Sequence, residues 1–231
     1  MKILGIVPGR GGSKRLPNKN IRLLAGKPLI NWTIDTVRGV PDVVDILVST
    51  DSREIASVAK EAGALVPWLR PDELASDTAT SVDVCLHALD WYEREKGEVD
   101  GLLLLQPTSP FRKAGTIKQG IEIYKSYGGG RPVVALSPAD SHPMWCYSLD
   151  GGVLNPFIGE TDLIVRSQDL PKAYVINGAL YLASPKHLRE TQSFVVKTTA
   201  PLLIDDPKER VDIDTEWDWM IAEYFLSIIP A

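Results

Sequence analysis

Acidic residues are absent from the first 34 residues of this 231-residue chain, although Asp and Glu outnumber Lys and Arg by 30 to 25 overall. The same stretch carries seven basic residues, so one cationic segment stands within an otherwise acidic protein. The net charge of −5 argues against non-specific binding to nucleic acid. A local group of unopposed cations predicts instead that this segment binds an anion.

Cysteine, histidine and long apolar runs are also scarce. Two cysteines cannot make a disulfide framework, and three scattered histidines give no zinc-ligand spacing and no Ser-His-Asp triad. No apolar run approaches the ~20 residues that span a bilayer, and the N-terminal apolar stretch is too short for a signal peptide. We therefore expect a cytosolic protein, without a membrane partner, that folds as one domain over residues 1–231.

Strand-like and helix-like segments alternate along the first 136 residues. This order is typical of a three-layer α/β fold, in which a mostly parallel sheet is covered by helices on both faces. The pattern breaks over 137–172, a stretch with several prolines, glycines and aromatics that we expect to leave the core as a hairpin or arm. Periodicity predicts strands at 2–8, 45–49, 101–105, 132–136 and 174–182, and helices at 28–38, 82–96, 114–127 and 216–229.

A glycine-rich, basic loop follows the first strand, and residues 8–20 read Pro-Gly-Arg-Gly-Gly-Ser-Lys-Arg-Leu-Pro-Asn-Lys-Asn. Glycines let a backbone approach an anion closely. Arg10, Lys14, Arg15 and Lys19 fit a polyphosphate better than one carboxylate, because four neighbouring cations repel one another without several negative charges between them. The spacing matches neither a P-loop nor the G-x-G-x-x-G fingerprint, which argues against a Rossmann oxidoreductase. A flexible basic surface loop is the alternative.

Three further segments carry polar residues at positions suited to a nucleotide and a metal. Residues 70–81 offer a guanidinium and several hydroxyls before a helix, although such hydroxyls also cap helices. Gln106 follows a predicted strand, where a polar side chain faces the ligand crevice. Asp212 and Asp214 share one side of an extended segment, an arrangement that suits Mg²⁺; a helix cap is the alternative.

The loop sequence Gly-Arg-Gly-Gly-Ser-Lys-Arg-Leu-Pro-Asn-Lys-Asn resembles the N-terminal signature of the acylneuraminate cytidylyltransferases, the family of the CMP-sialic acid synthetases. Gln-Pro-Thr-Ser-Pro-Phe-Arg at 106–112, Asn-Gly-Ala-Leu-Tyr at 177–181 and Asp-Ile-Asp at 212–214 are similar to further family motifs. The resemblance implies a Rossmann-like nucleotidyltransferase fold of the glycosyltransferase-A type, with the 137–172 excursion as a small dimerisation and sugar-binding insertion in a homodimer. It also implies that CMP passes from CTP to the anomeric hydroxyl of a nine-carbon 2-keto sugar acid, with release of pyrophosphate.

The same resemblance gives individual residues their expected roles. Catalysis would depend on Arg10, Lys19 and Asp214, and Mg²⁺ would be held by Asp212 and Asp214. The nucleotide would contact Arg10, Gly11, Gly12, Ser13, Lys19, Asn20, Arg70, Ala79 and Ser81. The acidic sugar would contact Gln106, Arg166, Asn177, Tyr181 and Phe194.

Three sugar-side positions depart from the pattern of the N-acetylneuraminate enzymes. Trp145, Val175 and Val195 each make the sugar pocket less polar or smaller. A deoxygenated relative, such as legionaminate or pseudaminate, would lose less by facing apolar groups. Two alternatives stay open, namely a cytidylyltransferase for Kdo or another sugar, and a non-catalytic nucleotide-binding module. Retention of both Asp212 and Asp214 argues against the module.

Overall fold

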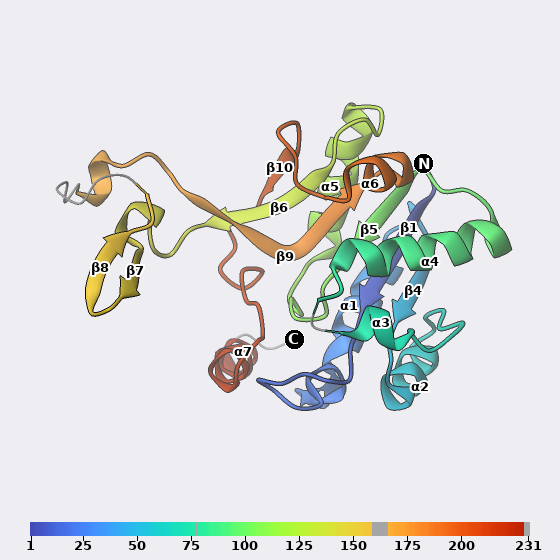
Figure 1. Cartoon of the computed structure of the whole chain (residues 1–231). Helices are drawn as coiled ribbons and strands as arrows, with labels where there is room; N and C mark the ends of the chain where they lie inside the picture. Colours follow the sequence, from blue (N-terminus) through green and yellow to red (C-terminus); the bar gives the residue numbers. More distant parts are fainter. Residues whose placement is uncertain (77, 159–165, 229–231) are drawn as a thin grey trace.

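The computed structural model describes residues 1–76, 78–158 and 166–228, and its centre is a six-stranded sheet (Figure 1). The strands are β1 (Ile3–Pro8), β4 (Val43–Ser49), β5 (Gly101–Leu104), β6 (Val133–Pro138), β9 (Tyr174–Ala183) and β10 (Ala200–Leu203). Their order across the sheet is β10-β6-β9-β5-β1-β4. All neighbours pair in parallel except β9, which is antiparallel to both β5 and β6. The mainly parallel α/β sheet confirms the fold class predicted from the alternation.

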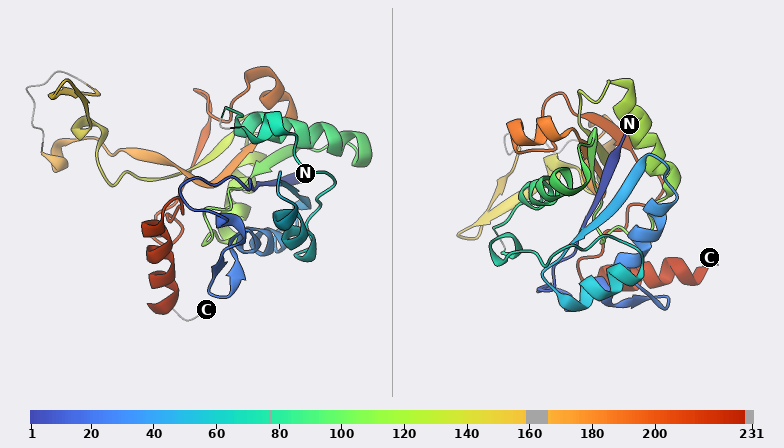
Figure 2. Two further views of the ribbon diagram at one scale, coloured as in Figure 1. Left: turned by 60° about the horizontal axis from the view of Figure 1, so that its bottom comes forward. Right: turned by 90° about the vertical axis from the view of Figure 1, so that its right-hand side faces the viewer.

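The side chains of β1 alternate between two cores, one on each face of the sheet. Ile3 and Val7 belong to the first core, and Leu4 and Ile6 belong to the second. Each of these side chains is fully buried, which stabilises the fold by about 1.5–3 kcal/mol per residue. The first core is covered by α1 (Leu29–Arg38), α2 (Arg53–Glu61) and α5 (Ala114–Ser126), and the second by α4 (Ser81–Lys96) and α6 (Pro185–Thr191). The views in Figure 2 show the resulting three layers.

The C-terminal helix α7 (Glu216–Ile228) packs on the loop after β1 rather than on the sheet (Figure 1). Trp219, which is 1% exposed, is enclosed there with Leu16, Leu24 and Phe111. This third cluster holds the first loop and the start of α7 close together. The short elements nearby are η1 (Lys19–Ile21), β2 (Leu23–Leu24), β3 (Lys27–Pro28) and α3 (Asp72–Ala75). In the described ranges, no helix is both long enough and apolar enough to cross a bilayer.

Between β6 and β9 the chain leaves the body of the protein, and we term residues 139–173 the arm (Figure 1). The arm contains η2 (Pro143–Trp145), the antiparallel hairpin of β7 (Tyr147–Asp150) and β8 (Val153–Pro156), and η3 (Ser167–Asp169). Gly151 and Gly152 form its turn with φ values of 55° and 84°, as a two-residue type I′ turn requires. Residues 159–165 of the expected excursion lie outside the described residues.

Candidate active site

A cavity of 630 Å³ opens at the carboxyl ends of β1 and β5, and we term it cavity 1. Ligands of open α/β sheets bind at this edge, because the loops that follow parallel strands meet there. The cavity is lined by ten of the residues predicted for the site, namely Arg10, Ser13, Lys19, Asn20, Arg70, Ala79, Ser81, Gln106, Asp212 and Asp214.

Two partly buried hydrogen bonds shape the glycine-rich loop. Asn20, 6% exposed, donates from Nδ2 to the carbonyl of Arg10 at 3.0 Å. Asp51, directly after β4, accepts the amide hydrogen of Gly11 through Oδ1 at 2.8 Å. The amide of Gly11 is therefore engaged within the protein, and Gly12 is exposed at the rim with open space around it. Asp51 was not among the predicted site residues. Its position directly after a strand was nevertheless a sign that it lies at the ligand-binding edge of the sheet.

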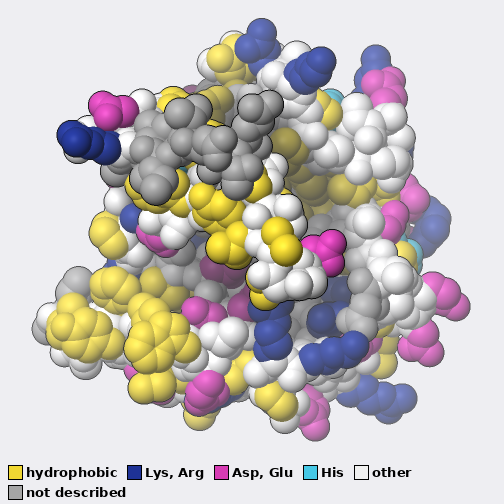
Figure 3. Space-filling model, turned by 60° about the vertical axis from the view of Figure 1, so that its left-hand side comes forward, with side chains coloured by type: hydrophobic (Ala, Val, Ile, Leu, Met, Phe, Trp, Pro, Cys, Tyr) yellow, Lys and Arg dark blue, Asp and Glu magenta, His cyan; other side chains and the backbone are white. Residues whose placement is uncertain are grey.

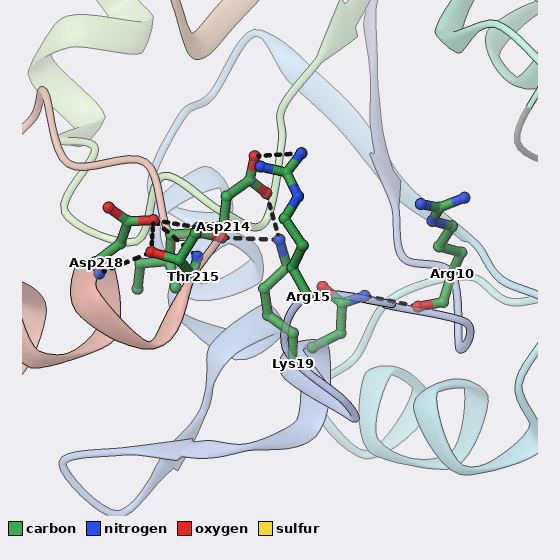
Figure 4. Close-up of polar contacts among 8 residues, drawn as sticks. Arg10, Arg15, Lys19, Asp214, Thr215 and Asp218 are labelled. Carbon is green, nitrogen blue, oxygen red and sulfur yellow. Dashed lines mark hydrogen bonds and ion pairs between the residues drawn. The ribbon is translucent and has the colours of Figure 1, made fainter.

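Asp214 lies between two cations (Figure 4). Its Oδ1 accepts a hydrogen bond from Lys19 Nζ at 2.8 Å, and its Oδ2 is 3.6 Å from Arg15 Nη2. The bond from Lys19 lowers the pKa of Asp214, so this carboxylate is ionised at neutral pH. Lys19, 8% exposed, also donates to the carbonyl of Ile213 at 2.8 Å. The cationic loop is thus bound directly to the Asp-Ile-Asp segment.

The Asp-Ile-Asp segment is irregular rather than a strand, yet its side chains still alternate. Ile213 is fully buried and its amide donates to the carbonyl of Thr108 at 2.8 Å, which leaves both flanking carboxylates at cavity 1. Thr215 caps α7 by accepting the amide hydrogen of Asp218 through Oγ1 at 3.3 Å, and Asp218 in return accepts the amide hydrogen of Thr215 at 2.7 Å (Figure 4). The Asp214 side chain is therefore not the helix cap, and it remains at the cavity.

The two carboxylates at cavity 1 are oxygen ligands of the kind that Mg²⁺ takes. Asp212 and Asp214 line cavity 1, and within the described part of the chain no cluster of three or more His, Cys, Asp or Glu side chains is placed to hold a metal. Mg²⁺ commonly takes one or two carboxylates and completes its shell with substrate phosphates and water, rather than sitting in an all-protein cage. The donor set therefore matches that use better than a permanent structural metal.

The opposite end of cavity 1 is formed by Arg70 and the start of α4. Arg70, 6% exposed, donates from Nε to Ser49 Oγ at 3.0 Å, and burial lowers its pKa. Thr80 caps α4 by accepting the amide hydrogen of Asp83 at 3.1 Å, so capping explains Thr80. Ala79 and Ser81 face the cavity beside this cap, where the helix N-terminus adds partial positive charge.

A second cavity of 490 Å³, termed cavity 2, lies between β9 and α7. Asp212 lines both cavities, so they adjoin at this carboxylate. Gln106 marks the same boundary. It lines cavity 1, and its side chain lies against Gly178, which lines cavity 2. A Cβ atom added to Gly178 would collide with Gln106 Oε1. Position 178 must therefore remain glycine for the Gln106 amide to lie across it.

Asn177 lines cavity 2, but its amide is already bonded within the protein. Nδ2 donates to Ser137 Oγ at 2.8 Å and to the carbonyl of Glu209 at 3.2 Å, and Oδ1 accepts from the amide of Ala179 at 2.8 Å. Asn177 thus fastens β9 to the loop that precedes Asp212.

Three predicted sugar contacts do not line either cavity. Phe194, 5% exposed, belongs to the second core and supports Tyr181, whose ring centroid is 5.6 Å away. Burial, and then the charge of Asp212, raise the pKa of Tyr181, which lines neither cavity 1 nor cavity 2. Arg166 is exposed beside η3 in the arm, which projects away from the body (Figure 1).

Arg112 is a supporting residue that the motifs contained but gave no role. It is 3% exposed, and it donates to Thr33 Oγ1 at 3.1 Å and to the backbone carbonyls of Gln106 (2.8 Å), Gly178 (3.4 Å) and Ala179. Burial lowers its pKa to about 9, which leaves the guanidinium charged at neutral pH. It joins the end of β5 to β9 at the residues that separate the cavities.

Known proteins resemble this chain over most of its length. A family model described as cytidylyltransferase matches residues 4–128. A CMP-N,N'-diacetyllegionaminic acid synthase of Legionella pneumophila is 43% identical and is covered over 97% of its length by 99% of this chain. An N-acylneuraminate cytidylyltransferase of Streptococcus agalactiae is 38% identical over 95% of this chain, which spans 52% of that protein. The fold matches a solved CMP:2-keto-3-deoxy-manno-octonic acid synthetase with a TM-score of 0.72 and 15% identity, covering 99% of each chain.

Proposed function

The chain belongs to the cytidylyltransferase family, and from that premise we propose that it transfers CMP from CTP to the anomeric hydroxyl of a nine-carbon 2-keto sugar acid and releases pyrophosphate. The observation that carries this proposal is the pair of cavities that adjoin at Asp212. Cavity 1 combines the cationic loop with two carboxylates, and cavity 2 offers separate room for an acceptor. We place the reaction in the cytoplasm, where CTP is made.

The cations of cavity 1 would hold the triphosphate in line with the acceptor. Arg10, Ser13 and Lys19 would contact phosphate oxygens, while Arg70, Ala79 and Ser81 would surround the cytidine at the start of α4. The acceptor oxygen then forms a bond to the α-phosphorus, the bond from that phosphorus to pyrophosphate breaks, and the hydroxyl proton passes to solvent. No histidine is among the described residues that line cavity 1. Positioning and charge neutralisation therefore account for the catalysis.

Magnesium is the cofactor that we propose for this site. Asp212 and Asp214 would hold it, and when bound it would neutralise phosphate charge and lower the pKa of the attacking hydroxyl. Lys19 now occupies one oxygen of Asp214, and the negative triphosphate would attract this ammonium. The pairing between Lys19 and Asp214 thus keeps the carboxylate in place until the nucleotide arrives.

We propose a deoxygenated nonulosonic acid as the acceptor, with N,N'-diacetyllegionaminate as the first candidate. The 43% identical relative carries that acid in its name. The departures from the N-acetylneuraminate pattern lie apart in the structure. Val175 lines cavity 2, Trp145 lines a cavity at the base of the arm, and Val195 is 48% exposed and lines neither cavity 1 nor cavity 2. Of these three residues, Val175 is therefore the one that supports a deoxygenated acid as the acceptor.

Pyrophosphate release with Mg²⁺ and CTP tests the proposed function across N,N'-diacetyllegionaminate, pseudaminate, N-acetylneuraminate and Kdo. We expect turnover with one or more nine-carbon acids, and the highest kcat/KM with diacetyllegionaminate. A preference for Kdo would replace the proposed acceptor. Stabilisation by CTP in a thermal shift experiment, without pyrophosphate release from any acid, would contradict the enzymatic role and support a nucleotide-binding module.

We further propose that the protein is a homodimer joined through the arm. Four large apolar side chains of the hairpin, Leu149, Val153, Leu154 and Phe157, are 60–73% exposed. Figure 3 shows hydrophobic side chains gathered on this face of the molecule. An exposed apolar patch of this kind is typical of a protein interface. Arg166 does not line cavity 1 or cavity 2 of its own chain, and we propose that in such a dimer Arg166 of the partner subunit serves the site.

Replacing Leu154 with aspartate should turn the dimer into a monomer, because a charge would be buried in the interface. Analytical ultracentrifugation would measure the mass, and CTP binding should be retained while sugar-dependent turnover falls by about tenfold or more. Tyr127→Asp adds the same charge to an apolar residue that is 44% exposed after α5, and should leave the mass unchanged. A wild-type protein that sediments as a monomer would contradict the proposal.

A further inference from the structure

Cavity 2 has an apolar wall that the transfer reaction itself does not require. Strand β9 contributes Val175 and Ile176, which are 50% and 49% exposed, and α7 contributes Ile221 and Phe225. These side chains come from two elements that meet only in the folded protein. The wall faces a space of 490 Å³ that begins at Asp212, next to the site of transfer.

Several polar groups of cavity 2 are engaged in hydrogen bonds within the protein. Arg210 donates from Nη2 to the carbonyl of Pro138 at 3.2 Å and pairs with Asp140. Oδ2 of Asp218 accepts from Thr215 in the capping box of α7, and the amide of Asn177 is fully bonded within the protein. A hydroxyl group that lay against the apolar wall would give up hydrogen bonds to water and gain no partner from the wall.

We propose that cavity 2 receives the exocyclic chain of the sugar acid, and that Val175 and Ile221 select acids whose chain carries a methyl group in place of a hydroxyl. This inference rests on the proposed function. The anomeric oxygen must lie near the α-phosphate and Asp212, so the rest of the acid extends into the other cavity that Asp212 lines. There a methyl group gains apolar contacts, whereas a hydroxyl loses solvation without compensation.

The test compares kcat/KM for N,N'-diacetyllegionaminate and N-acetylneuraminate in Val175→Thr and Ile221→Thr. The first change keeps the branched shape and replaces a methyl with a hydroxyl; the second shortens the side chain and adds a hydroxyl. Each should lower the preference for diacetyllegionaminate by about tenfold, the effect of one apolar contact in a pocket. Met220→Thr is the matched control, since this neighbour on α7 is 55% exposed and lines neither cavity. It should leave the preference unchanged.

The outcomes separate this inference from the function on which it rests. A wild-type enzyme that uses both acids, with a preference that neither variant changes while CTP binding is intact, would overturn the inference and leave the function standing. A wild-type enzyme that uses none of the nine-carbon acids, pseudaminate included, would overturn both. A shift in Val175→Thr alone would still support the selective wall if Ile221→Thr fails to fold.

Discussion

Asp214→Asn is expected to lower kcat by about 100-fold or more at saturating substrates and Mg²⁺, which corresponds to about 3 kcal/mol of barrier. Asparagine keeps the shape of the side chain and can still accept the hydrogen bond from Lys19. It lacks the negative charge that a magnesium ligand must supply beside Arg15 and Lys19. The loss should therefore appear in the chemical step more than in the folding of the loop.

Steady-state pyrophosphate release measures the effect, with Asp205→Asn as the control. Asp205 is an exposed carboxylate of the loop after β10 and lines neither cavity 1 nor cavity 2, so its loss should change kcat by less than twofold. Thermal shift gives a second readout, because added Mg²⁺ should stabilise the CTP-bound wild type more than CTP-bound Asp214→Asn. A fall in kcat of less than fivefold would exclude Asp214 as a metal ligand.

Local sequence patterns were sufficient to predict that the first loop and Gln106 meet at one edge of the sheet, whereas the family resemblance supplied Asn20, Arg70, Ala79 and Ser81. Residues at the ends of β1 and β5 were expected at one sheet edge, and the cationic loop and Gln106 both line the cavity there. The spacing of Asp212 and Asp214 was also informative, because the buried Ile213 between them keeps both carboxylates on the same side even in an irregular segment. These features depend on neighbours in the sequence, which periodicity describes well.

Cavity 2 could not be predicted in the same way, because its walls are distant in sequence. Strand β9 enters the sheet between β5 and β6 in the antiparallel sense after the arm has left the body, and no local period encodes that order. Strand β9 and α7 bring Val175 and Ile221 to the same cavity. The sequence singled out Val175 but not Ile221. Similarly, Phe194 was expected to contact the sugar, but its ring lies in the second core. Burial of an aromatic ring stabilises the fold, and this gain favours the core over an exposed position at the site.

The guanidinium of Arg112 explains how these distant parts keep one geometry, and its removal is the second change with a large expected effect. Arg112→Met should lower the free energy of unfolding by about 3–5 kcal/mol. Methionine nearly preserves the length and volume, so the cost arises chiefly from acceptors that lose their donor. Those acceptors are the hydroxyl of Thr33 and the carbonyls of Gln106, Gly178 and Ala179.

Urea unfolding followed by circular dichroism would measure the loss, with Arg94→Met as the matched control. The Arg94 side chain is 67% exposed and pairs only with Glu95 in the described residues, so its replacement should cost less than about 1 kcal/mol. Arg112→Lys should fall between the two, because an ammonium keeps the charge but cannot reach all four acceptors. If Arg112→Met proved as stable as the control, water would have to satisfy these carbonyls, and the guanidinium would not be what holds Gln106 across Gly178.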